Sequence, residues 1–227
     1  LMYSLSLRGY YVSTAMRRAF QVLSGHAAWV AAGSAVLTVA VDDFWGRKRR
    51  KKQRREGGPP ETAAETETPR WFAWSLKGDW LWWVAGGYAV SSLAFNVADG
   101  LNHFLVPAVL FEDDTLVTQM INPENNDVLA LVAGGLAPCL TAPWWEETLY
   151  RGFLLPALHA FAPRHVALPL SAVLFAAHHL TLTAALPLAV LGAVWAQLYV
   201  ASGNLVVPIA IHALWNTRVF LGALLGL

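Results

Sequence analysis

The sequence predicts an all-α fold, a polytopic membrane helix bundle with about six spans. Two observations support this prediction. Of the 227 residues, 56% are hydrophobic and only 14% are charged, whereas a soluble globular domain carries roughly 25% charged residues. Apolar runs of about 20 residues, the length that a helix needs to cross a bilayer, recur along the chain. We therefore expect an integral, multi-pass membrane protein whose first partner is the lipid bilayer.

The first expected span covers residues 19–41, AFQVLSGHAAWVAAGSAVLTVAV, which is apolar over about the required length. A basic block follows it, RKRRKKQRR from Arg47 to Arg55, which holds eight of the sixteen Lys and Arg residues. Basic residues beside a span favour the cytosolic or equivalent side, so the block is expected to orient the protein. Binding of the block to anionic lipid or to nucleic acid is the alternative. No aromatic residue is interleaved with the arginines, and we expect no nucleic-acid partner.

The segment that follows is predicted to be unstructured. Residues 56–69, EGGPPETAAETETP, are rich in Glu, Thr, Pro and Gly and contain no large apolar residue. A segment of this composition cannot bury enough apolar surface to fold. We therefore expect a flexible basic and acidic loop over residues 47–69.

The second expected span begins at a cluster of tryptophans. Five of them lie between Trp71 and Trp83, and indole rings gather where one end of the ring is wet and the other is apolar. The span itself is expected over residues 80–98. Residues 101–127 contain only a short apolar run, broken by Pro107, and predict a re-entrant or interfacial piece followed by a polar loop.

Apolar residues become denser from Val128 onward, and three or four further helices fit the remaining sequence. The first is expected to kink at Pro143. The expected ranges are 128–160, 165–180, 184–201 and 204–225. We therefore divide the chain into N-terminal membrane helices, residues 1–127, and a C-terminal core, residues 128–227.

Two adjacent glutamates lie in this apolar core. Glu146 and Glu147 are the only carboxylate side chains after Asp127. On a helix, Glu147 and Arg151 are four residues apart and share a face, in the order that favours an ion pair. Glu146 lies about 100° around the helix from Glu147, so it cannot share Arg151 equally. A structural pair with Arg151 is the expected role of Glu147. Glu146, without a local partner in a low dielectric, favours proton chemistry or a histidine partner.

Two histidine motifs supply such partners. In FAAHH, Phe175 and His179 lie one helical turn apart, while His178 points about 100° away from His179. In HALWN, His212 and Asn216 lie four residues apart and present two hydrogen-bond donors on one helix face. That arrangement suits stabilisation of a developing negative oxygen. A lone histidine in a membrane helix is more often a structural hydrogen-bonding residue.

The motifs EETLYR, FAAHH and HALWN, in this order and spacing, resemble the CAAX prenyl protease and bacteriocin-processing (CPBP, Abi) family of intramembrane glutamate proteases. The resemblance covers about residues 128–220 and implies that the C-terminal core is a four-helix, protease-like bundle. The string APWWEETLYRGFLLPAL is most similar to plant and algal plastid members. The resemblance therefore also implies a plastid membrane, either thylakoid or envelope.

The resemblance implies roles for seven residues. Four correspond to catalytic positions of the family: Glu146, His179, His212 and Asn216. Three correspond to positions that shape the site: Glu147, Arg151 and Phe175. The first two catalytic residues would activate a water molecule, and the last two would form an oxyanion hole. The implied reaction is hydrolysis of a peptide bond in a peptide or membrane-protein substrate, without a metal or cofactor.

Two alternatives remain open. Two glutamates and several histidines are plausible ligands for zinc or iron, although no H-E-x-x-H helix is present. Insensitivity of the activity to chelators would separate the two mechanisms. The second alternative is a membrane scaffold or assembly factor that keeps the protease fold and binds a larger membrane protein complex, because a fold does not determine a function.

Overall fold

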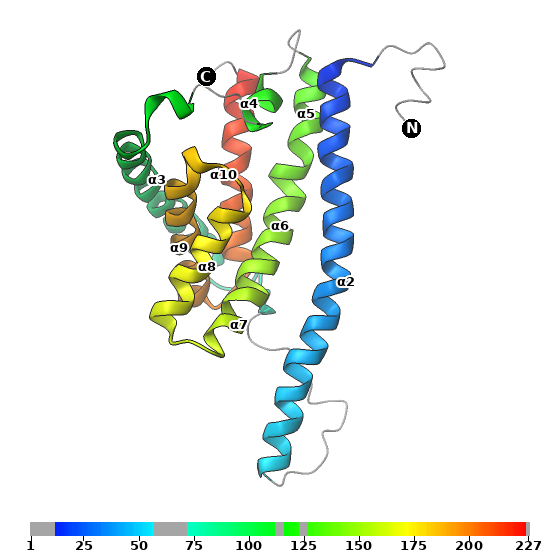
Figure 1. Cartoon of the computed structure of the whole chain (residues 1–227), viewed down its shortest axis with the longest axis vertical. Coiled ribbons are helices and arrows are strands. Elements are labelled where there is room, and N and C mark those ends of the chain that lie inside the picture. The colour runs from blue at the N-terminus through cyan, green and yellow to red at the C-terminus, as the bar shows by residue number, and fades with distance from the viewer. Residues whose placement is uncertain (1–11, 57–71, 112–115, 123–126, 226–227) are drawn as a thin grey trace.

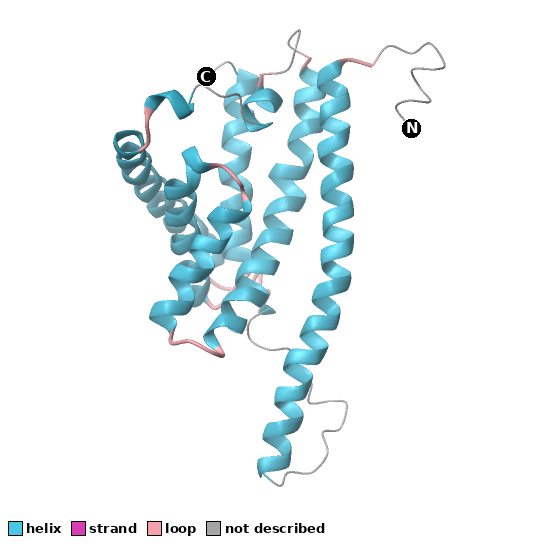
Figure 2. Ribbon diagram, viewed as in Figure 1, coloured by secondary structure: helices cyan, strands magenta, loops and turns pink. Residues whose placement is uncertain are grey.

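The computed structural model describes residues 12–56, 72–111, 116–122 and 127–225. These residues form helices joined by short loops, and none of the four ranges contains a strand (Figure 2). The predicted all-α fold is confirmed. The α-helices, in chain order, are α2 (Thr14–Glu56), α3 (Trp80–Leu105), α4 (Leu116–Ile121), α5 (Val128–Leu136), α6 (Ala142–Glu147), α7 (Leu155–His159), α8 (Arg164–His178), α9 (Ala185–Ser202) and α10 (Val206–Leu225). Shorter 3₁₀ and π-helical pieces are η2 (Ala108–Phe111), η4 (Ala137–Thr141), η5 (Thr148–Leu154) and η6 (Leu182–Ala184).

Four helical stretches among the described residues are long and apolar enough to cross a membrane: Thr14–Val41, Val128–His159, Leu182–Ser202 and Val206–Leu225. The other two expected spans also form helices. α3 has 26 residues but is less apolar than these four stretches. α8 has 15 residues, which makes it about 22 Å long and shorter than the hydrocarbon core of about 30 Å. The protein is therefore an integral membrane protein, and its span count agrees roughly with the expected six.

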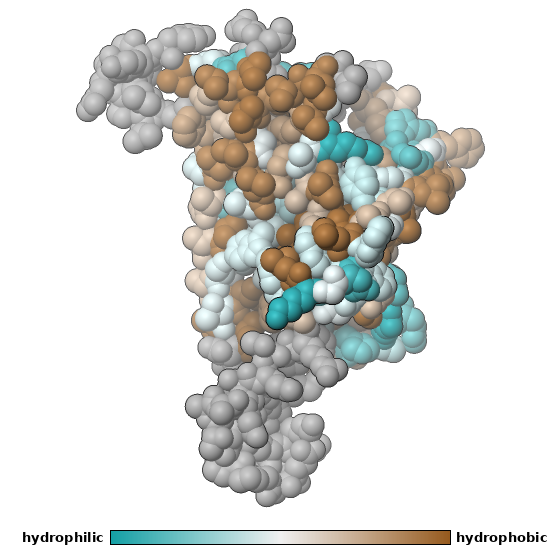
Figure 3. Space-filling view, turned by 180° about the vertical axis from the view of Figure 1, so that it is seen from behind, coloured by the Kyte–Doolittle hydropathy of each residue, from teal (hydrophilic) through white to brown (hydrophobic). Residues whose placement is uncertain are grey.

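The outer surface of the bundle is rich in large apolar side chains. Phe104 is 87% exposed, Trp82 80% and Val36 69%. Figure 3 shows apolar residues over much of the face that it displays, with hydrophilic residues in smaller patches. A soluble monomer rarely exposes so much contiguous apolar surface, whereas lipid chains cover such a surface in a membrane.

α2 is longer than the sequence suggested. We expected a flexible loop from residue 47, but α2 continues to Glu56. Lys, Arg, Gln and Glu are good helix formers, and the first helix-breaking residues are Gly57, Gly58 and Pro59. The remainder of the expected loop, residues 57–69, lies outside the described residues. Figure 1 shows α2 beside α5 and α6 and extending beyond the other helices.

The core of the bundle lies among α3, α8, α9 and α10. α9 packs between α8 and α3, and α10 packs against α3, α6 and η4 (Figure 1). A cluster of buried side chains joins these helices: Val84, Tyr150, Phe175, Leu191, Trp195, Val207, Ile211 and Trp215. α3, which we grouped with the N-terminal helices, thus contributes Val84 to the same core.

The path from α5 to α7 contains two π-helical segments, η4 and η5, on either side of α6. In η4 the N–H of Ala142 bonds to the carbonyl of Ala137, a pairing of residues five apart. The next pairing of this kind would join Pro138 to Pro143, but proline has no N–H. The Pro138 carbonyl is therefore free to accept a hydrogen bond from outside its own helix. π-helical turns occur frequently at functional sites.

Candidate active site

α6 carries the two glutamates into the interior. Glu147 is 0% exposed and Glu146 8%. α10 packs on this short helix from one side, and α2 approaches from the other, where a Cβ on Gly33 would lie 2.4 Å from a ring atom of Trp145. The absence of a side chain at Gly33 thus allows α2 to lie close to α6. The candidate active site is the set of ionisable groups that meets these glutamates.

Glu147 holds two basic side chains with one oxygen. Its Oε1 accepts hydrogen bonds from Arg151 Nη1 at 2.9 Å and from His212 Nδ1 at 3.0 Å. Arg151 is 1% exposed, and its Nη2 donates to the backbone carbonyl of Gly192 at 2.9 Å. The expected pairing of Glu147 with Arg151 is present. The bond to His212 on α10 was not expected from helix spacing, because the two residues lie far apart in the sequence.

Aromatic rings surround Arg151. Its guanidinium carbon lies 4.6 Å from the ring centre of Phe175 and 5.7 Å from that of Trp195. Phe175 also makes edge contacts with His179 and His212, with ring centres 4.9 and 6.0 Å apart. These contacts place Phe175 between the two histidines, where it can fix the position of both rings.

Gly192 permits the contact between Arg151 and α9. A Cβ at this position would lie 3.1 Å from the Cα of Ala172 and 3.2 Å from the Ala172 carbonyl oxygen. The backbones of α8 and α9 therefore approach closely here. The sequence motifs did not indicate that Gly192 belongs to the site, because the atom that Arg151 binds is the backbone carbonyl oxygen of Gly192.

Glu146 faces His179 without touching it. The distance from Glu146 Oε2 to His179 Nε2 is 4.0 Å, which is too long for a direct hydrogen bond. Glu146 Oε2 is buried and makes no hydrogen bond to any described residue. His179 Nδ1 lies 2.8 Å from the Phe175 carbonyl. A carbonyl only accepts, so Nδ1 carries the proton, and in a neutral ring Nε2 presents a lone pair towards Glu146.

His179 is positioned by the end of its helix. It is the residue that caps the C-terminus of α8. Its N–H bonds to the carbonyl of Ala176, and the N–H of the next residue, Leu180, bonds to the carbonyl of Ala177. Leu180 follows with φ of +52°, a left-handed conformation that is unusual for a leucine. Such backbone conformations concentrate at functional sites. The chain therefore turns away immediately after His179 and leaves its ring at the edge of the bundle interior.

The tautomer of His212 is fixed by Glu147. A carboxylate that is ion-paired with Arg151 only accepts hydrogen bonds. His212 Nδ1, which contacts the same oxygen of Glu147, must therefore carry the hydrogen. The other nitrogen, Nε2, has a lone pair in the neutral ring and an N–H only when the ring carries both protons. The ring also lies 4.5 Å from the Trp195 ring, at an angle of 33°. His212 can therefore donate into the site only as an imidazolium, for which the carboxylate of Glu147 is a suitable partner.

Asn216 lies one turn after His212 on α10. Its Nδ2 donates to the Pro138 carbonyl at 2.7 Å, the carbonyl that Pro143 leaves without a backbone partner. One of the two amide hydrogens is thus used for structure, and the second remains for another acceptor. The structure brings Glu146 together with His179, and Glu147 with Arg151 and His212, while Asn216 joins α10 to η4.

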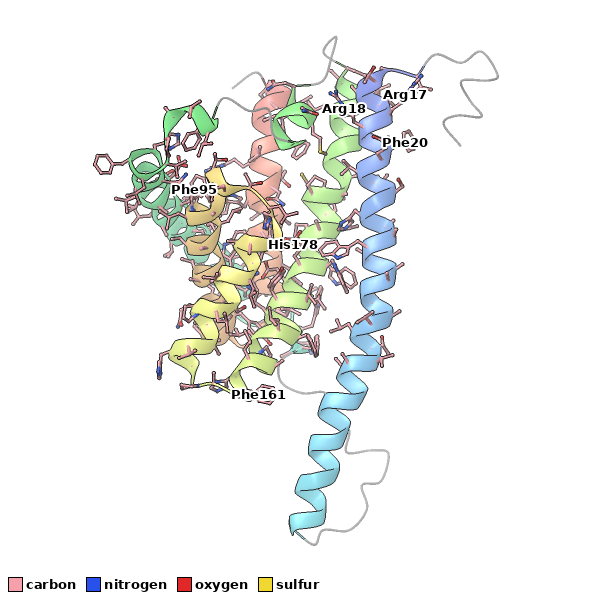
Figure 4. The ribbon with its side chains drawn as sticks, viewed as in Figure 1. Arg17, Arg18, Phe20, Phe95, Phe161 and His178 are labelled. Carbon is pink, nitrogen blue, oxygen red and sulfur yellow. The ribbon has the colours of Figure 1, made fainter. Side chains whose placement is uncertain are left out.

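Two residues near the site were not among our predictions. His178, at the end of α8 on the side towards α6 and α2 (Figure 4), stacks on Trp29 of α2 with ring centres 5.1 Å apart. Trp29 also makes an edge contact with Trp145, at 5.8 Å. The tandem His178 and His179 signalled that one ring would face the site, but helix geometry did not indicate that both could approach Glu146.

A separate cavity of about 380 Å³ lies where α7, α8 and α9 meet. Its lining includes Leu155, Arg164 and Tyr199, and none of the seven predicted site residues. Cavity volume alone would therefore have directed attention away from the glutamates. The buried carboxylates and their basic neighbours are the stronger indication of where chemistry takes place.

Comparison with known protein families gives a match that includes the candidate active site. Residues 128–218 match the family model described as type II CAAX prenyl endopeptidase, Rce1-like. The matched segment contains all seven residues predicted from the sequence motifs and begins at the first residue of α5. Comparison with curated proteins and with solved structures gives no match.

Proposed function

We propose that this chain is an intramembrane endopeptidase that activates water with Glu146 and His179. The proposal is supported by residues 128–218, which match the family model of the type II CAAX prenyl endopeptidase, Rce1-like. The family resemblance predicted from the three motifs is confirmed over this range. The domain implies CAAX intramembrane protease activity. The mechanism below is our proposal for how the described side chains perform it.

The observation that supports the proposal is the 4.0 Å separation between Glu146 Oε2 and His179 Nε2. A water molecule about 2.8 Å from each atom would bridge them. The carboxylate takes a proton from this water while the oxygen attacks the carbonyl carbon of the scissile peptide bond. The Nε2 lone pair of His179 accepts the second hydrogen as a hydrogen bond. When the tetrahedral intermediate collapses, the C–N bond breaks and the proton on Glu146 passes to the leaving amine.

The negative oxygen of the intermediate needs donors. His212 would supply Nε2–H as an imidazolium, with Nδ1–H held by Glu147. Asn216 would supply the amide hydrogen that is not bonded to Pro138. Preorganised donors of this kind act in a poorly hydrated site, where they stabilise charge more effectively than in water. Glu147 and Arg151 would then act as positioning residues that keep His212 in place.

The proposed step uses no metal, because Glu146 itself accepts the proton. Treatment with a strong chelator should therefore not lower the rate of hydrolysis. A rate that falls on chelation and returns with added Zn²⁺ would instead assign a metal the role of activating the water.

The test of the function is a quantitative comparison of membrane-protein termini between cells with the wild-type chain and cells with Glu146→Gln. We expect new termini that depend on Glu146. Glu146→Gln keeps the shape of the side chain but cannot accept the proton. Identical termini in both cells, at equal abundance of the two chains, would contradict proteolysis.

The second candidate is a scaffold or assembly factor that binds a larger membrane protein complex. It is favoured by the exposed indoles before and within α3, where Trp74 is 53% and Trp82 80% exposed. Tryptophan is enriched in protein interfaces. The two functions separate in one variant, since full rescue of a null phenotype by Glu146→Gln supports the scaffold, whereas loss of rescue supports proteolysis.

The location in a plastid membrane is also a proposal. It is supported by the similarity of APWWEETLYRGFLLPAL to plastid members of the family. Fractionation of thylakoid and envelope membranes with an antibody to the native chain would test it. Recovery of the chain in another membrane system would contradict it.

A further inference from the structure

We propose that Glu146, His178 and His179 bind one divalent transition-metal ion, with Zn²⁺ the best fit, and that the bound ion blocks hydrolysis. The effect on hydrolysis rests on the proposed function, whereas the binding of the ion does not. No ion takes part in the mechanism proposed above, so this would be a regulatory site. His178 has no part in that mechanism.

The three donor atoms lie close to one another. One carboxylate oxygen of Glu146 and one ring nitrogen from each histidine all lie within 4.8 Å of one another. Zinc binds such ligands at about 2.0–2.2 Å, which places the ligand atoms of a tetrahedral site about 3.4 Å apart. Each pair of atoms would therefore have to close by at most roughly 1.4 Å, a movement that side-chain rotation can supply. One of these pairs, Glu146 Oε2 and His179 Nε2, is 4.0 Å apart and needs less.

His179 is already oriented as a metal ligand. A metal-bound histidine almost always donates its other ring N–H to a carboxylate, a backbone carbonyl or water. His179 Nδ1 bonds to the Phe175 carbonyl at 2.8 Å, which leaves the Nε2 lone pair directed to the side of Glu146. This contact fixes both the tautomer and the plane of the ring.

Glu146 supplies an oxygen that lacks a partner. Glu146 is 8% exposed, and its Oε2 makes no hydrogen bond to any described residue. A buried ionised carboxylate oxygen without a partner is unfavourable, and a cation compensates for it more completely than a neutral donor does. The unpaired oxygen thus favours a positive ligand at the place where the two histidines meet it.

His178 completes the set from the exposed side. Its ring is stacked on Trp29 with ring centres 5.1 Å apart and planes 20° apart, and it contacts the edge of His179 at 5.3 Å. The side chain lies at the surface of the bundle, so binding of an ion there does not require the bundle to unfold. The stack with Trp29 reduces the conformational freedom that the imidazole would lose on binding an ion.

The ligand set indicates which ions would bind. Two imidazoles and one carboxylate suit Zn²⁺, Cu²⁺, Ni²⁺ and Co²⁺, whereas Mg²⁺ and Ca²⁺ prefer oxygen ligands only. The ion would occupy the space between Glu146 and His179 and would bind both groups that activate water in our proposal. Glu146 could then no longer accept a proton, so the expected effect is inhibition.

The binding test uses the purified full chain in detergent, freed of metal by dialysis against a chelator. Co²⁺ is the probe, because its visible absorption reports a site with nitrogen and oxygen ligands. We expect saturable binding with one ion per chain and displacement by Zn²⁺. Loss of a ligand lowers affinity at least as much as loss of a residue that orients a ligand, so His178→Gln should weaken binding by at least about 10- to 100-fold. His165→Gln, on an exposed histidine of the same helix, is the matched control and should bind as the wild type does.

Thermal unfolding gives a second readout of binding that requires no substrate. Zn²⁺ that binds only the folded chain raises the unfolding midpoint, and we expect this rise in the wild type and in His165→Gln but not in His178→Gln. Absence of Co²⁺ binding by the folded wild type, or equal binding by His178→Gln, would overturn the metal site. Neither result depends on proteolytic activity.

Inhibition is tested with the hydrolysis that depends on Glu146. Zn²⁺ should inhibit the wild type at concentrations that match its binding, and the concentration needed to inhibit His178→Gln should rise by the same factor as its dissociation constant. Stimulation by Zn²⁺, or binding that leaves the rate unchanged, would overturn the regulatory role. Failure of Glu146→Gln to alter any terminus would instead overturn the proposed function and leave the metal site standing.

Discussion

The side-chain amide of Asn216 donates to the backbone carbonyl of Pro138, with Nδ2 and O 2.7 Å apart. The proline at residue 143 removes the backbone N–H that a continued π-helical pattern would offer to this carbonyl. Asn216 therefore joins α10 to the irregular turn just before the two glutamates. If its second amide hydrogen also serves the oxyanion, one side chain both holds the turn and takes part in the reaction.

Asn216→Ala should affect both stability and rate. The part-buried carbonyl of Pro138 would lose its donor, and loss of such a hydrogen bond lowers the free energy of unfolding by about 0.5–1.5 kcal/mol. Loss of an oxyanion donor should slow hydrolysis by roughly a hundredfold or more. The measurements are denaturant or thermal unfolding and turnover per folded molecule. Unchanged turnover per folded molecule in Asn216→Ala would leave Asn216 with the structural role alone.

Glu147→Gln should reduce the amount of folded protein more than it alters the chemistry. The substitution removes the carboxylate to which the buried Arg151 is hydrogen-bonded, and breaking a buried pair in this way costs about 3–5 kcal/mol. Glu146→Gln is the matched control, because the same change is made one residue earlier. Glu146 Oε2 makes no hydrogen bond to a described residue, so we expect normal abundance and lost activity. The opposite pattern would exchange the roles of the two glutamates.

Gly192→Ala should separate α8 from α9. The new Cβ would lie 3.1 Å from the backbone Cα of Ala172, and overpacking of this kind typically costs about 1–3 kcal/mol. The hydrogen bond from Arg151 to the Gly192 carbonyl would lengthen as α9 moves. Gly86→Ala on α3 is the control, since a Cβ there meets no atom within 4 Å and alanine favours a helix by about 1 kcal/mol. Equal thermal midpoints for the two variants would show that α8 and α9 are not tightly packed at this position.

From the hydrogen bonds of Asp127 we predict a small pH dependence of protein stability that arises at the start of α5. The hydrogen bond from Ser13, with oxygens 2.5 Å apart, and that from the N–H of Ala130, at 3.0 Å, hold the pKa of Asp127 below its usual range. Because the folded-state pKa is lowered, the stabilisation is present above the pKa of the unfolded chain and is lost as pH falls through the folded-state pKa. Ser13→Ala should raise the pKa of Asp127 and move this loss to higher pH.

The measurement is the thermal midpoint between about pH 2 and pH 6, a range that extends below the ordinary pKa of aspartate, where the loss is expected. Ser24→Ala is the control, because the Ser24 hydroxyl bonds to the Gln21 carbonyl on the exposed surface and contacts no acid. The prediction fails if Ser13→Ala and Ser24→Ala respond to acid alike.

The orientation of the protein can be tested in the segment after α2, which lies outside the described residues. From the basic block we predict that this segment lies on the cytosolic or equivalent side of the membrane. A protease site inserted near Glu61 should be cut from that side in sealed membranes. Cleavage only from the opposite side would show that every span has the orientation opposite to the predicted one.

The positions of the helices followed from apolar run lengths, because each span must satisfy its own backbone hydrogen bonds in lipid. The expected ranges 184–201 and 204–225 agree closely with α9 and α10. The end of α2 was predicted wrongly, since the basic block was grouped with the loop expected after it, although lysine and arginine favour helices. Composition alone does not distinguish a solvated helix from a solvated loop.

Within the site, the pair of Glu147 and Arg151 could be predicted, because both lie on one helix four residues apart. The bond from His212 to Glu147 could not, because it depends on how α10 packs against α6. The π-helical turns were also missed. Pro143 was interpreted as a kink, and a single sequence does not show that two wide turns would enclose α6.

Gly192 contributes to the site through its carbonyl oxygen, an atom that every amino acid possesses. No substitution at this position can delete the acceptor that Arg151 binds. A substitution can only change the distance between α8 and α9. A series of glycine, alanine, serine and valine at this position would therefore vary the spacing of the two helices in graded steps, while every ionisable group of the site is retained. Activity plotted against that series would measure how much misalignment the reaction tolerates.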